Sequence, residues 1–249
     1  MPENTREIRE TIDGLREEIR RIERRPPQRA CFTSSGRPEI DALLPGGGFP
    51  RGALAELAGG PASGKTGVVL SALAHAMGTK GLAAFVDGRG ELYPPAVTSF
   101  GVDLARLLVV RPIAPERGAC ESVRYALWAA EALLASGAFE AVAMDVPVER
   151  VRAREQIERA RVSALDAASL DRMFLRLRAA AEKGGGVALW LGLPQGARVP
   201  SAARLELSAG AAGVQVRRAF ARGAAGAPLT EWQGTSPCPS PSLDASHAA

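Results

Sequence analysis

A short glycine-rich segment of this chain has the residue types and the spacing that phosphate binding requires. It reads Gly-Gly-Pro-Ala-Ser-Gly-Lys-Thr and matches the pattern G-x-x-x-x-G-K-[ST] of the phosphate-binding P-loop. In such a loop, successive backbone N–H groups surround the phosphate oxygens, and the following helix adds partial positive charge at its N-terminus. The pattern therefore predicts phosphate binding by Gly59, Gly60, Pro61, Ala62, Ser63, Gly64, Lys65 and Thr66.

The lysine of this segment stands out because the chain otherwise prefers arginine. Of 31 basic residues, only Lys65, Lys80 and Lys183 are lysines. The wide planar fork of an arginine differs from a compact ammonium group, so arginine does not replace this lysine easily. We expect Lys65 to reach the β- and γ-phosphates of a nucleotide and the Thr66 hydroxyl to hold Mg²⁺.

The P-loop needs a buried strand before it and a helix after it, and the flanking residues predict both. Residues 53–58 form an apolar run, and residues 66–76 have apolar side chains at helical spacing. Further strands are predicted at 82–87, 107–110, 141–145, 187–193, 203–207 and 213–219, and further helices at 91–100, 121–135 and 166–183. Nearly continuous apolar strands that alternate with helices predict an α/β fold with a mostly parallel central sheet, flanked by helices on both faces.

Three acidic residues are candidates for the chemistry around a bound nucleotide. Asp145 closes the apolar run AVAMD, where an acid can orient Mg²⁺ and its water molecules. The alternative is that Asp145 caps the following turn. Asp87 and Glu91 both lie near the end of another strand, and either could position the attacking water or be a solvated loop acid.

Two segments of the chain could contact partner molecules. An apolar stripe on an otherwise charged N-terminal helix is formed by Ile8, Ile12, Leu15, Ile19 and Ile22. The stripe either folds back on its own domain or docks on a partner. The second segment is rich in arginine and comprises Arg150, Arg152, Arg154, Arg159 and Arg161. It is either a solvated charged face or a contact to the phosphate backbone of DNA.

Length and composition limit the class of protein. The 249 residues suffice for one large α/β domain, and 46% hydrophobic and 23% charged residues are ordinary for a globular chain. We expect no membrane span and no secretory signal, and three scattered cysteines are typical of reduced, cytoplasmic thiols. The net charge of +4 permits a polyanionic partner without requiring one. The predicted organisation is an N-terminal amphipathic helix and linker (1–30), a nucleotide-binding core (31–231) and a disordered tail (232–249).

Several pieces of the chain resemble the core of the RecA recombinase family. They are FTSSGRPEIDALLPGGGFPRGALAELAGGPASGKT, which starts at Phe32, followed by FVD, FGVDLARLLVVRP and ASGAFEAVAMD. The resemblance extends over about residues 32–231. It implies a RecA-like P-loop core that binds ATP or ADP with Mg²⁺, in a cytoplasmic, nucleoid-associated bacterial protein.

The chain also departs from this family at positions that matter for hydrolysis. In RecA proteins the second strand leads into Asp-x-Glu, whose Glu activates the hydrolytic water. Here Asp87 matches, but Arg89 occupies the Glu position and Glu91 comes two residues later. The strand that ends in Asn-Gln in RecA continues here into residues 190–194, which contain no Gln. These departures imply nucleotide binding with poor hydrolysis.

The chain is also similar to the ImuA-type branch of this family. That resemblance rests on a RecA-like core of this length, a basic N-terminal helix and a short connection after the fifth strand. It implies an accessory role in translesion synthesis during the SOS response, with RecA and a Y-family-like polymerase homologue as partners. The alternative is a DNA-dependent ATPase or recombination mediator of the RecA family.

Overall fold

The computed structural model describes residues 31–112, 119–149, 167–195, 199–210, 213–221 and 231–234. Three predictions lie outside these residues. They concern the apolar stripe (Ile8, Ile12, Leu15, Ile19 and Ile22), the arginines of 150–161 and the tail beyond residue 234.

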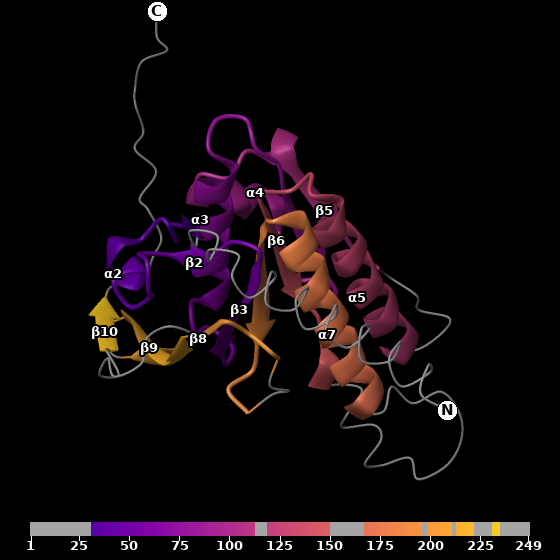
Figure 1. Cartoon of the computed structure of the whole chain (residues 1–249). Helices are drawn as coiled ribbons and strands as arrows, with labels where there is room; N and C mark the ends of the chain where they lie inside the picture. The colour runs from indigo at the N-terminus through magenta and orange to yellow at the C-terminus, as the bar shows by residue number, and fades with distance from the viewer. Residues whose placement is uncertain are drawn as a thin grey trace, which may run out of the picture. The chain divides into compact units, whose positions relative to one another are not determined.

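An eight-stranded sheet organises the described residues (Figure 1). The strand order is β10-β9-β8-β3-β7-β6-β4-β5. The strands are β3 (Ala53–Gly59), β4 (Ala83–Asp87), β5 (Leu107–Val110), β6 (Ala141–Asp145), β7 (Val187–Gly192), β8 (Ala203–Gly210), β9 (Gly213–Ala221) and β10 (Glu231–Gly234). All neighbours from β8 to β5 pair in parallel, and β9 and β10 extend the β8 edge in antiparallel register. The predicted mostly parallel α/β fold is confirmed.

Helices cover both faces of the parallel region, which explains why its strands are almost entirely apolar. On one face, α3 (Lys65–Met77) packs its buried Val68, Val69 and Leu73 against Ala55 and Leu57 of β3. The other face lies under α5 (Ala119–Ser136) and α7 (Ala167–Gly184). The central strands β3, β4, β6 and β7 therefore bury both sets of their alternating side chains.

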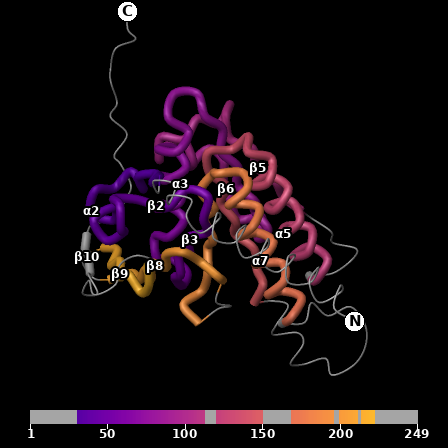
Figure 2. Tube along the Cα trace, in the orientation of Figure 1, coloured from indigo at the N-terminus to yellow at the C-terminus, as the bar shows by residue number. Residues whose placement is uncertain are grey.

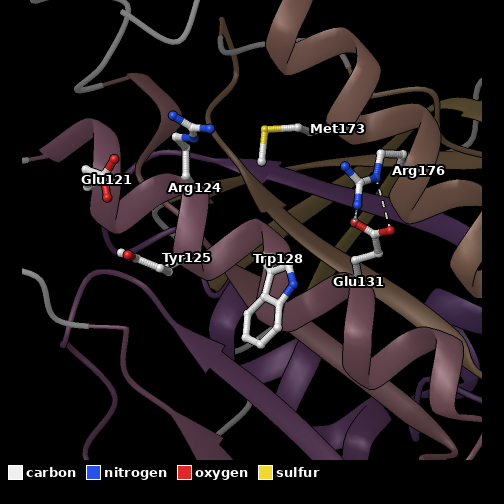
Figure 3. Close-up of a pocket in the computed structure, with 7 residues that line it drawn as sticks. All are labelled: Glu121, Arg124, Tyr125, Trp128, Glu131, Met173 and Arg176. Carbon is white, nitrogen blue, oxygen red and sulfur yellow. Dashed lines mark hydrogen bonds and ion pairs between the residues drawn. The ribbon is translucent and has the colours of Figure 1, made fainter. Parts of the chain in front are cut away.

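The helices α5 and α7 run side by side over this second face (Figure 2). Beneath them, Phe174 of α7 meets Trp190 of β7 edge to face, with ring centroids 5.3 Å apart. On the outer side, an ion pair of 2.9 Å joins Arg176 of α7 to Glu131 of α5 (Figure 3). This pair borders a pocket of about 420 Å³, which Trp128 and other side chains line.

Short elements surround the sheet. They are the ribbon of β1 (Phe32–Thr33) and β2 (Phe49–Pro50), the helices α2 (Pro38–Asp41) and α4 (Pro94–Val97), and the 3₁₀ turns η1 (Thr98–Phe100) and η2 (Leu104–Arg106). Within the described residues, no helix is both long and apolar enough to cross a membrane.

The predicted strands and long helices agree closely with the structure, apart from the ends of some elements and one unpredicted strand. The helix predicted at 91–100 is shorter, because residues 91–93 precede the first turn and Pro94 starts α4. β10 was not predicted, and it crosses the predicted boundary between core and tail at residue 232. A four-residue strand that pairs only with β9 leaves too little apolar pattern in the sequence to be recognised.

We expect Trp190→Ala to lower the free energy of unfolding by about 3–5 kcal/mol, because it removes a buried aromatic side chain and leaves a cavity beside Phe174. Trp128→Ala is the matched control, since that side chain is 63% exposed and its loss should change stability by less than about 0.5 kcal/mol. Urea unfolding followed by circular dichroism measures both. Equal losses in the two variants would contradict the described packing.

Candidate functional site

The P-loop connects the end of β3 to the start of α3 in a conformation suited to anions. Ala62 (φ 58°) and Gly64 (φ 80°) both adopt left-handed backbone conformations, which turn neighbouring N–H groups into the concave side of the loop. Gly64 is needed for a second reason, because a Cβ there would lie 2.7 Å from Val214 of β9. Ser63 is buried, and its Oγ has no hydrogen-bond partner among the described residues. The loop therefore has the left-handed backbone conformations of an anion-binding turn at the N-terminus of a helix.

Lys65 lies at the base of this loop and is held by two carbonyl groups. Its Nζ donates hydrogen bonds to the Gly59 oxygen at 2.8 Å and to the Gly192 oxygen at 3.0 Å. Burial lowers the pKa of Lys65, and the negative charge of Asp145 partly opposes this shift. These two carbonyls belong to the neighbouring strands β3 and β7, so the ammonium group sits where the sheet ends and the loop begins.

A cavity of about 530 Å³ opens in front of the loop. It is lined by Gly60, Pro61, Ala62, Ser63, Gly64, Lys65, Thr66, Arg89, Glu91, Asp145 and Leu193. The structure thus brings together most of the predicted site: seven of the eight loop residues, Glu91 and Asp145. Gly59 lies directly behind it as the last residue of β3 and a partner of Lys65.

Arg89 occupies the centre of the acidic side of this cavity. Its Nε donates to Asp145 Oδ1 at 2.7 Å, and its Nη2 lies 2.8 Å from Glu149 Oε1. The side chains of Arg89 and Asp145 are only 14% and 12% exposed. Burial alone would lower the pKa of Arg89, but the hydrogen bonds and charges of the two carboxylates outweigh burial and raise it. Burial raises the pKa of Asp145, against the opposing hydrogen bond and charge of Arg89.

The other candidate acid, Asp87, holds the backbone in place. It is 2% exposed and accepts hydrogen bonds from the backbone N–H groups of Glu91 (3.0 Å) and Leu92 (3.1 Å). Arg111 adds an ion pair of 2.9 Å. Because both oxygens of Asp87 are already engaged, this carboxylate shapes the loop after β4 and is poorly placed to activate water.

The cavity fits the phosphates of a nucleotide better than it fits Mg²⁺. Loop N–H groups and the Lys65 ammonium suit phosphate oxygens. The residues for Mg²⁺ would be Thr66 and Asp145, and Arg89 already neutralises one of these two. Asp145 is thus paired with Arg89 in this structure, and its Mg²⁺ role stays a prediction.

Comparison with known proteins places the chain in a family. The RecA N-terminal domain matches residues 15–188 of this chain. The chain belongs to the RecA family.

Protein RecA of Corynebacterium aurimucosum is 42% identical over 121 residues, which is 49% of this chain and 29% of that protein. Protein RecA of Streptococcus pyogenes serotype M49 is 35% identical over 127 residues, 51% of this chain and 32% of that protein. The chain thus matches about a third of the length of these RecA proteins.

For a RecA-family chain, the residue that sequence reasoning undervalued is Arg89. It was recognised only as a departure from Asp-x-Glu, and its pairing with Asp145 and Glu149 was not predicted. The sequence carries only a weak signal for this ion pair. The arginine follows one strand and the acids follow another, so their contact depends on which strands are neighbours in the sheet.

We expect Arg89→Met to destabilise the fold by about 3 kcal/mol near neutral pH, because it leaves the mostly buried Asp145 without its cation. The loss of Arg89 should raise the pKa of Asp145 further above its usual value of about 3.9. A carboxyl group with a raised folded pKa favours folding at low pH, and that contribution is lost as pH rises through the folded pKa. The deficit relative to the wild type should therefore shrink towards about pH 4.

Urea unfolding at a series of pH values measures this deficit. Arg178→Met is the control, because Arg178 forms an exposed pair with Glu182 and its loss should cost less than about 1 kcal/mol at every pH. A deficit of Arg89→Met that does not vary with pH would contradict the described ion pair.

Proposed function

We propose that this RecA-family chain is a nucleotide-binding accessory protein of DNA-damage tolerance and a poor ATPase. The observation that carries the proposal is the ion pair between Arg89 and Asp145 in front of an intact P-loop. It combines a loop suited to phosphate with an arginine at the position where the resembling family has its water-activating Glu.

Nucleotide binding is supported by the shape and charge of the loop. Family membership makes ATP or ADP the expected nucleotide. Left-handed Ala62 and Gly64 orient the N–H groups, and Lys65 lies within the same cavity. A phosphate that approaches Lys65 would offer its ammonium a stronger partner than the two neutral carbonyls that hold it.

Poor hydrolysis follows from the chemistry of Arg89. A general base must accept a proton, and an arginine is always protonated in proteins. Arg89 is also held by two carboxylates that raise its pKa further. At the end of β7, the apolar Leu193 lines the cavity, and residues 193–202 connect β7 to β8. This short connection fits a chain that has lost most of the DNA-binding loop expected of a recombinase.

An accessory role is supported by the ImuA-type resemblance. In that role the chain would act in the bacterial cytoplasm by contacts with RecA and with a Y-family-like polymerase homologue during the SOS response. The apolar stripe of residues 8–22 would be the docking element, and nucleotide would act as a structural or regulatory ligand.

One observation favours a second candidate, a DNA-dependent ATPase or recombination mediator. Glu91 lines the same cavity as Lys65 and Asp145. It is exposed, and its negative charge contributes to raising the pKa of Asp145, so the two carboxylates lie close enough to interact. If a bound nucleotide brought water within reach of Glu91, this carboxylate could replace the missing Glu.

Binding and hydrolysis of ATP separate the two candidates. We expect the purified protein to bind ATP, and we expect Lys65→Ala to weaken binding at least about tenfold without loss of folded structure. Steady-state hydrolysis with Mg²⁺ should stay at background with or without single-stranded DNA. Turnover that rises with DNA and is lost in both Lys65→Ala and Glu91→Gln would instead favour the ATPase.

A pull-down tests the accessory role. We expect Ile12→Asp and Ile19→Asp each to reduce capture of RecA and the polymerase homologue at least about tenfold, because a charge interrupts the apolar stripe. Arg6→Asp is the control, since Arg6 lies on the opposite face of the predicted helix. Unchanged capture by both Ile variants would count against docking through this stripe.

A further inference from the structure

Arg89 is placed to do more in this site than neutralise Asp145. Its guanidinium lines the phosphate cavity together with Lys65 and the P-loop. A guanidinium carries five N–H donors in one plane. Asp145 receives a hydrogen bond from Nε, and Glu149 forms its ion pair with Nη2. A guanidinium can serve carboxylates on one edge and phosphate oxygens on another, because its donors point in several directions.

The same arrangement opposes a divalent cation. A metal at this position would need the charge of Asp145, but Arg89 and Lys65 already bring two positive charges close to that carboxylate. The charge of Arg89 also contributes to lowering the pKa of Lys65, so the two cations interact across the cavity. A dication placed beside them would meet repulsion from both in a partly desolvated site.

We propose that Arg89 supplies the positive charge that a divalent cation supplies in metal-dependent nucleotide sites, so that the protein binds a nucleoside di- or triphosphate free of metal. This inference rests on the proposed nucleotide binding and specifies the form of the ligand. Asp145 and Glu149 act as positioning residues, because they hold the guanidinium at the cavity wall through two contacts. Lys65 and the loop N–H groups bind the phosphates from the other side.

The test compares the affinity for ATP in Mg²⁺ with the affinity in EDTA, by calorimetry on the full chain. For the wild type, we expect the two Kd values to agree within about threefold, since no metal is needed. For Arg89→Gln, we expect binding in EDTA to weaken at least about tenfold, because one of the two cations is gone. Mg²⁺ should then restore part of the affinity, because Asp145 is no longer neutralised. Gln keeps a hydrogen-bond donor near Asp145, which favours a folded variant.

Arg51→Gln is the matched control. It removes an arginine that forms a side-chain ion pair of 2.6 Å with Glu140 outside the nucleotide cavity, and it should leave both Kd values unchanged. A wild-type protein that loses tenfold or more of its affinity in EDTA would overturn this inference and leave nucleotide binding intact. No binding in either buffer would overturn the proposed nucleotide binding as well. The wild-type comparison decides the question even if Arg89→Gln fails to fold.

Discussion

Two carboxylates, Asp87 and Asp145, lie opposite each other in the register of the neighbouring strands β4 and β6, and each is neutralised by an arginine. Unpaired, two buried like charges at one end of a sheet would strongly disfavour folding. Arg111 reaches Asp87 and also donates to the Leu92 carbonyl, which fixes the loop after β4. That loop carries Arg89 back across the strand ends to Asp145. The ion pairs that neutralise Asp87 and Asp145 thus also position the residues on the acidic side of the phosphate cavity.

The phosphate side of the cavity depends on the sheet in a different way. Lys65 is anchored to the last carbonyls of β3 and β7, and Gly64 fits closely against Val214 of β9. The antiparallel strand β9 therefore packs directly against the P-loop. Ion pairs hold β8, the strand with which β9 pairs: the buried Glu56 of β3 pairs with Arg204 of β8 at 3.1 Å, and Arg204 lies 3.5 Å from Glu206. A substitution in β9 that moves Val214 should therefore also shift the P-loop at Gly64.

In the proposed function, the site keeps the part of a RecA-family nucleotide centre that recognises phosphate and lacks the part that activates water. The backbone N–H groups of the loop and Lys65 belong to one short segment, and the last carbonyls of β3 and β7 hold the Lys65 ammonium in place. Activation of water needs a free carboxylate at a defined distance, and here Asp87 and Asp145 are both engaged. In the same proposal, Arg89 between two acids favours binding of phosphate over activation of water.

The sequence by itself determined the P-loop, the strands and helices around it, and the mostly parallel α/β fold, because these depend on residues close together in the chain. It also identified Arg89 as standing where a Glu was expected. Only the tertiary structure decided what Arg89 does. Arg89 and Asp145 are 56 positions apart, and they meet because β4 and β6 are neighbours in the sheet. The sequence could not distinguish the roles of Asp87, Glu91 and Asp145. Those roles depend on whether each carboxylate has a hydrogen-bond or ion-pair partner, and several of these partners come from distant strands and loops.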